Sequence, residues 1–168
     1  MGGIELHDNV LLVDREPNEL DDLAIRFSAI LDEFDIDLRL EIADALPPAV
    51  ADAEAFRRVL RNLLNNAIKF SEAGDEVTVR VSAVEEWIEV TVEDTGIGID
   101  AEFLPRLFEA FTQESTGNRR AYEGSGLGLA VAKRLITLMD GTIDVDTEKG
   151  VGTRVTVRLP QKHAAEQA

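Results

Sequence analysis

The chain has 168 residues, of which 45% are apolar and 30% are charged, and its net charge is −16. This is the size and composition of one globular domain, and no apolar run approaches the ~20 residues that a membrane-spanning helix needs. The acidic charge argues against binding of nucleic acid or anionic lipid, and the lack of Cys excludes disulfides and thiolate chemistry. We expect a cytoplasmic protein in which any phosphate is bound by a local site.

We expect one domain from residue 9 to residue 160, with a linker segment before it (1–8) and a polar tail after it (161–168). The run NVLLVD (9–14) has the composition of a short strand. The run that follows it (16–34) has apolar residues at helical spacing, which predicts a helix.

The next elements are a half-buried strand, a long helix and a hairpin. Alternation in DIDLRLEIA (35–43) predicts the strand, and Asp52 is placed as the N-cap of a helix that runs to about Phe70. The segments EVTVRVSAV and EWIEVTVED alternate on either side of a short connection, which predicts an antiparallel hairpin.

The last third of the chain predicts two helices and two strands. A short helix is expected near residues 101–108, followed by an aperiodic polar stretch that is a candidate mobile loop (112–126). The helix LGLAVAKRLITLM is expected to end at Asp140-Gly141, and TIDVDT and TRVTVRLP then form a pair of strands. This order of elements predicts an α+β sandwich with helices on one face of a largely antiparallel sheet.

The long central helix is expected to carry a polar face rich in amides. At about 100° per residue, Asn62, Asn65, Asn66 and Lys69 fall within an arc of roughly 100°. Asparagine is a poor helix former, and charged residues are the usual occupants of a solvated face. Amide oxygens with one ammonium group suit a hydrated Mg²⁺ and the phosphates that it carries. A merely solvated face is the alternative interpretation.

Two glycine-rich segments are candidates for binding a nucleotide. In EDTGIGI, Gly96 and Gly98 would let a ligand approach the backbone, and Asp94 could accept a hydrogen bond from the adenine amine. A tight turn capped by Asp94 is the alternative. In GSGLGLAVAKRL, glycines at a helix start are a plausible phosphate cradle. This segment matches neither the dinucleotide motif nor the P-loop.

Taken together, these segments resemble the catalytic and ATP-binding domain of sensor histidine kinases, within the wider family that includes gyrase, a heat-shock chaperone and mismatch-repair proteins. RRVLRNLLNNAIKFSEAG is similar to the N box, VEDTGIGI to the G1 box and LFEAFTQ to the F box. GSGLGLAVAKRLITLMDGTI is similar to the G2 box, and GVGTRVTVRLP to the closing strand. The resemblance runs from about Val10 to Pro160 and implies the two-layer Bergerat ATP-binding fold.

The resemblance also implies ATP and Mg²⁺ as ligands. Asn66 would coordinate Mg²⁺, and Asn62 and Lys69 would act with it on the phosphates. Residues 112–123 would form a lid over the nucleotide. The implied site comprises Asn62, Asn66, Lys69, Phe70, Asp94, Gly96, Gly98, Ile99, Arg119, Arg120, Gly124, Ser125, Gly126, Leu127 and Gly128.

The phosphoacceptor is expected on another segment or protein. His7 is followed by an acid but lacks the proline of the acceptor motif, and His163 lies in a polar tail. The implied partners are therefore a histidine-containing dimerisation domain and, indirectly, a response regulator. No contact with nucleic acid or membrane is expected from this domain.

Four other functions are weighed against this one. ATP-hydrolysing relatives carry a glutamate base where Asn62 stands, and an amide cannot take a proton from water. The start VLLVDREP resembles a receiver domain, but Arg15 stands where such a domain has its second acidic residue, and no parallel βαβ repeat follows. A pseudokinase or docking module of the same fold is the principal alternative, and the serine-kinase branch of anti-sigma factors fits the NNAIKF and LFEAF segments less well.

Overall fold

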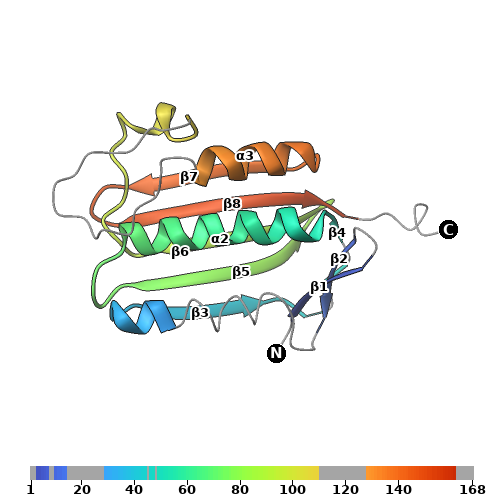
Figure 1. The fold of residues 1–168 in the computed structure, drawn as a ribbon, viewed down its shortest axis with the longest axis horizontal. Helices are drawn as coiled ribbons and strands as arrows, with labels where there is room; N and C mark the ends of the chain where they lie inside the picture. The colour runs from blue at the N-terminus through green and yellow to red at the C-terminus, as the bar shows by residue number, and fades with distance from the viewer. Residues whose placement is uncertain are drawn as a thin grey trace.

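The computed structural model describes residues 3–7, 10–14, 29–44, 46–47, 49–109 and 128–161 (Figure 1). Its main layer is a five-stranded sheet in the order β3-β5-β6-β8-β7. β3 pairs with β5 in parallel, and the other neighbours are antiparallel. The strands are β3 (Asp37–Ile42), β5 (Glu76–Val84), β6 (Trp87–Asp94), β7 (Thr142–Glu148) and β8 (Gly152–Pro160).

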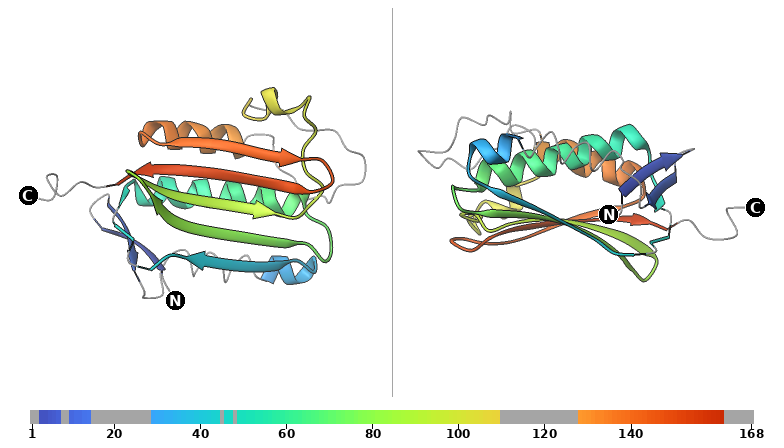
Figure 2. Two further views of the ribbon diagram at one scale, coloured as in Figure 1. Left: turned by 180° about the vertical axis from the view of Figure 1, so that it is seen from behind. Right: turned by 90° about the horizontal axis from the view of Figure 1, so that it is seen from below.

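Both long helices lie on one face of this sheet, as the view along the layers shows (Figure 2). Alternate side chains of the central strands point toward them and are buried, among them Ile88 and Val90 of β6 and Val157 of β8. The hydrophobic core therefore lies between the helices and the sheet. The predicted α+β sandwich with a mostly antiparallel sheet is confirmed.

Helix α2 (Ala53–Phe70) crosses the middle of the sheet. It begins where the sequence predicts, because the Asp52 carboxylate accepts a hydrogen bond from the Ala55 backbone N–H at 2.8 Å. Leu63, Leu64 and Ile68 of its apolar stripe are at most 2% exposed. Burial of this stripe against the sheet fixes which face of α2 remains accessible.

Helix α3 (Gly128–Leu138) packs beside α2 and ends at the predicted Asp140-Gly141 pair. The left-handed residue is Asp140, with a φ of 59°, and the Gly141 N–H donates to the Ile136 carbonyl at 2.9 Å. Glycine is needed at 141 for space, since a Cβ there would press on the Arg158 carbonyl oxygen. The helix thus closes with a Schellman motif.

Three features differ from the expectations. Residues 1–8 were expected as a linker, yet β1 (Gly3–His7) pairs with β2 (Val10–Asp14), which in turn pairs with β4 (Ala49–Val50). This small second sheet was not predicted, because its strands are short and β4 is distant in the chain. The short helix expected near residues 101–108 is only a 3-10 turn, Leu104–Arg106, since Pro105 cannot supply a helical N–H.

The helix expected from residue 16 to residue 34 lies mostly outside the described residues. Of that stretch, residues 29–33 are helical. Within the part of the chain that the structure describes, no helix is long and apolar enough to cross a membrane.

Candidate functional site

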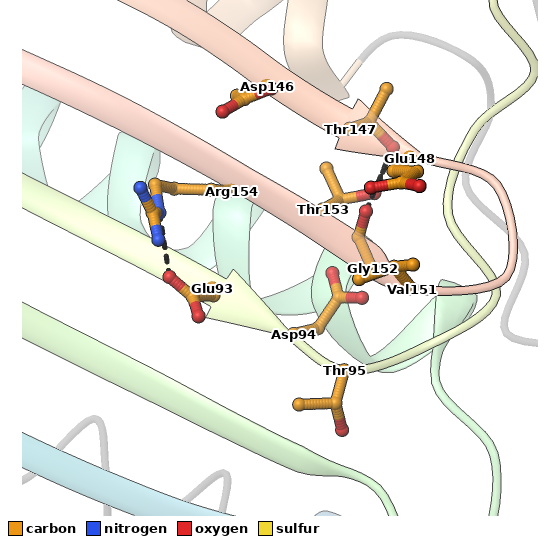
Figure 3. A pocket seen from close by; sticks show the side chains of 10 residues that line it. All are labelled: Glu93, Asp94, Thr95, Asp146, Thr147, Glu148, Val151, Gly152, Thr153 and Arg154. Atoms are coloured by element: carbon orange, nitrogen blue, oxygen red, sulfur yellow. Dashed lines mark hydrogen bonds and ion pairs between the residues drawn. The ribbon is translucent and has the colours of Figure 1, made fainter.

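Asp94 is the last residue of β6, and its side chain is turned toward the helix layer. It is only 5% exposed and lies opposite Thr153 in the β6–β8 ladder (Figure 3). Burial raises the pKa of Asp94 from 3.8 to about 7, although backbone N–H groups of Gly96 and Thr153 stabilise its carboxylate. A buried carboxyl with a raised pKa is a candidate for a functional site, and here it could accept a hydrogen bond from a ligand.

The loop after Asp94, residues 95–100, is called the glycine loop here, and its glycines are required for space. The Gly96 N–H donates to the Asp94 carboxylate at 3.0 Å, and a Cβ at Gly96 would press on the Phe70 carbonyl oxygen. Gly98 has a φ of 72°, and a Cβ there would press on the Glu148 carbonyl. The glycine loop therefore runs in backbone contact with both the end of α2 and the turn after β7.

The polar face of α2 is present as predicted. Asn62, Asn65, Asn66 and Lys69 are all half-buried, whereas the residues that alternate with them are buried. The Asn62 side-chain amide donates to the Gly128 carbonyl oxygen at 3.1 Å, which joins α2 to the first residue of α3. This contact brings two of the predicted segments together.

Lys69 and Phe70 end α2 beside the glycine loop. The Lys69 ammonium lies 5.7 Å from the centre of the Phe70 ring. Phe70 is 4% exposed, and its carbonyl oxygen accepts a hydrogen bond from the Ile97 N–H at 3.0 Å. The ring belongs to the core, and it is the backbone carbonyl of Phe70 that holds the glycine loop.

A pocket of about 220 Å³ is hollowed at this end of the sheet, between the end of β6 and the β7–β8 turn (Figure 3). Asp94 and Thr153 contribute to its lining, and the Glu93–Arg154 ion pair, at 2.7 Å, borders it from the opposite face of the sheet. Asn62, Asn66 and Lys69 do not line this pocket. The amide face of α2 therefore lies outside this pocket.

Several predicted site residues lie outside the described part of the chain. They are Arg119, Arg120, Gly124, Ser125, Gly126 and Leu127, together with the expected lid at residues 112–123. Of the remainder, Ile99 is 1% exposed and lies in the glycine loop. Thr153, which is 3% exposed beside Asp94, was not predicted as a site residue. Its signal in the sequence is a threonine among the inward positions of β8, which are otherwise apolar.

Comparison with known proteins places this geometry in a family. The sequence model described as "Histidine kinase-, DNA gyrase B-, and HSP90-like ATPase" matches residues 51–163, which is more than half of the chain. The chain belongs to this family. The matched range contains α2, the glycine loop and α3, so the resemblance seen in the sequence motifs is confirmed.

Relatives and solved structures of this ATPase family point to its histidine kinase branch. The chain is 45% identical over 109 residues to the sensor histidine kinase RcsC of Escherichia coli. This match covers 65% of the chain and 11% of RcsC. The mycobacterial sensor histidine kinase MprB has a similar structure, with a TM-score of 0.70, 26% identity, and coverage of 86% of this chain and 97% of that one.

A third similar structure is full-length ShkA in complex with AMPPNP. Its TM-score is 0.70 at 30% identity, and the match covers 89% of this chain and 32% of ShkA. The chain therefore spans about a tenth of RcsC and a third of ShkA.

Proposed function

We propose that this domain binds Mg·ATP and donates the γ-phosphate to a histidine on a separate dimerisation domain, in cytoplasmic two-component signalling. The observation that carries the proposal is the buried Asp94 carboxyl at the mouth of a glycine loop. A carboxylate in this position accepts a hydrogen bond from an exocyclic amine, which adenine has and guanine lacks at the equivalent atom. AMPPNP bound to the similar ShkA supports an adenine nucleotide.

The polar face of α2 would receive the phosphates. Asn66 would ligate Mg²⁺ with its amide oxygen, while Asn62 and Lys69 would contact the phosphates. The residues fit such a group, because α2 presents half-buried amides and one ammonium group on a face that the core leaves accessible. Mg²⁺, when bound, would neutralise phosphate charge. The side chains of α2 would supply positioning, and this is the main contribution of proteins to phosphoryl transfer.

The acceptor would come from outside this domain. A histidine nitrogen would attack the γ-phosphorus in line, the bond from that phosphorus to the β–γ bridging oxygen would break, and ADP would leave. A base on the dimerisation domain would take the imidazole proton. His7 lies in β1, and His163 lies outside the described residues. The name of RcsC, a sensor histidine kinase, supports this role. A response regulator would be the later recipient of the phosphoryl group.

A transfer assay tests the proposal. The chain is incubated with Mg²⁺ and ATP labelled at the γ-phosphate, with and without a separately produced dimerisation domain that carries the acceptor histidine. We expect acid-labile label on the dimerisation domain only, and none when its histidine is replaced. Release of inorganic phosphate by the chain alone would instead indicate an ATPase. Nucleotide binding without any transfer would indicate the docking module or pseudokinase.

A further inference from the structure

We propose that Thr147 is a positioning residue for the nucleotide, because its hydroxyl fixes the glycine loop against β7 and β8 and so sets where Asp94 meets the base. The inference rests on the proposed function and names one more residue of the same site. Thr147 is half-buried near the end of β7, on the strand face that also carries Ile143 and Val145. Figure 3 shows its side chain beside Thr153 and Gly152.

The Thr147 hydroxyl has three partners, one in the glycine loop and two at the start of β8. It accepts a hydrogen bond from the Ile99 backbone N–H at 2.8 Å and donates to the Gly152 carbonyl at 3.1 Å. It also lies 2.8 Å from the Thr153 hydroxyl. A hydroxyl has one hydrogen, so when Thr147 donates to Gly152 the Thr153 hydroxyl donates to Thr147. All three contacts are then satisfied at once.

The contact with Ile99 holds the far end of the glycine loop. Ile99 is 1% exposed, and loss of its hydrogen-bond partner would leave its N–H buried without one. A second link holds the middle of the loop, where the Gly150 N–H donates to the Ile97 carbonyl at 2.6 Å. The loop is thus attached to the β7–β8 hairpin at two points, of which Thr147 supplies the only one made by a side chain among the hydrogen bonds described.

The contacts with Gly152 and Thr153 connect the same hydroxyl to Asp94. Gly152 lies so close to Asp94 that a Cβ there would press on the Asp94 carbonyl oxygen. The Thr153 backbone N–H stabilises the Asp94 carboxylate. A shift of Thr147 would therefore be transmitted to the glycine loop and to the strand partner of Asp94 together. Within the described residues, no hydrogen bond joins the side chain of Thr91 to the glycine loop or to Asp94; Thr91 is 7% exposed on the opposite face of the sheet.

The test compares Thr147→Val, which keeps the shape and removes the hydroxyl, with Thr147→Ser, which keeps the hydroxyl. Thr91→Val is the matched control, since it makes the same change at a buried threonine of the same sheet. For each variant, Mg·ATP and Mg·ITP are titrated by calorimetry, because inosine lacks the exocyclic amine from which Asp94 would accept a hydrogen bond. Melting temperature and the hydrogen exchange of the Ile99 amide are measured alongside.

We expect Thr147→Val to weaken ATP binding by about three- to tenfold, the range for loss of one buried hydrogen bond. The preference for ATP over ITP should fall, and exchange of the Ile99 amide should accelerate. Thr147→Ser should restore all three readouts, and Thr91→Val should leave them unchanged. Two outcomes would overturn the role of Thr147 and leave the proposed function standing. They are a Thr147→Val variant that binds ATP as tightly as Thr91→Val, and a Thr147→Ser variant that binds ATP as weakly as Thr147→Val. If the unaltered chain binds no ATP, the proposed function falls, and this inference with it.

Discussion

A carboxyl that is 5% exposed costs free energy whenever it ionises, and Asp94 bears that cost at neutral pH. Its pKa of about 7 means that the nucleotide-free domain holds a mixture of protonated and ionised Asp94 near physiological pH. Such a residue is hard to explain by stability, because an amide of the same shape would avoid the cost. The proposed contact with an adenine amine gives it a use.

Replacement of Asp94 by Asn should therefore stabilise the nucleotide-free domain. Between pH 3.8 and about 7, the unfolded state releases a proton that the folded state keeps, so stability falls as pH rises through this window. Asp94→Asn removes that loss and should raise the free energy of unfolding at pH 8 by about 1–3 kcal/mol. The gain should shrink as pH is lowered toward 4. Urea denaturation from pH 4 to pH 8 checks this, and a gain independent of pH would contradict it.

Asn66 should matter more to Mg·ATP than the neighbouring amide of Asn65, which is not assigned a role. Asn66→Ala is expected to weaken Mg·ATP binding at least about tenfold, the loss of a charge-assisted ligand, and to abolish phosphoryl transfer. Asn65→Ala, the matched control, should stay within about twofold of the unaltered chain. Calorimetry in the presence and in the absence of Mg²⁺ checks both. Equal effects of the two substitutions would refute the role of Asn66.

At the scale of elements, α2 positions most of the site, so its N-terminus is a sensitive point for stability. Asp52→Ala removes the acceptor for the Ala55 N–H and should destabilise the domain by about 1 kcal/mol. Asp52→Asn keeps an acceptor and should lower the free energy of unfolding by only about a few tenths of a kcal/mol. The two variants are compared by urea denaturation at pH 7, and an equal loss in both would show that charge, not capping, is what matters.

The glycine loop is the second element on which the site depends. Gly96→Ala places a Cβ against the Phe70 carbonyl and should destabilise the domain by about 1–3 kcal/mol while weakening nucleotide binding. Gly150→Ala is a useful comparison, because nothing lies within 4 Å of its added Cβ although its φ of 86° is strained. Thermal denaturation should rank Gly96→Ala as the more damaging. The reverse order would contradict the close packing described.

Periodicity predicted the elements of the main sheet and its helices well, because each buries one face against a single core. α2, the β5–β6 hairpin and the β7–β8 pair all follow residue patterns that local physics enforces. The pairing of β2 with β4 could not be predicted in this way, since register between short and distant strands depends on tertiary contacts. The same holds for Thr147, whose partners lie in the glycine loop, 48 residues earlier in the chain, and at the start of β8.

At the scale of the whole molecule, the two faces of the sheet have different characters. One face packs on α2 and α3, whereas the other carries cross-strand ion pairs such as Glu41–Arg80, Arg80–Glu93 and Glu93–Arg154. The net charge of −16 already includes these arginines, and their side chains lie on the face away from the helices. We therefore expect phosphate to be bound locally, by the amides and the ammonium group of α2 on the helix side of the sheet.

The most direct test of the account is a titration of the unaltered chain and of Asp94→Asn with Mg·ATP and Mg·ITP. The unaltered chain should bind ATP more tightly than ITP by about three- to tenfold, the contribution of one buried hydrogen bond. Asp94→Asn should bind ATP more weakly and lose the preference. Binding of ATP and ITP with equal affinity by the unaltered chain, or no binding of ATP at millimolar concentration, would contradict the role given to Asp94 and the function that rests on it.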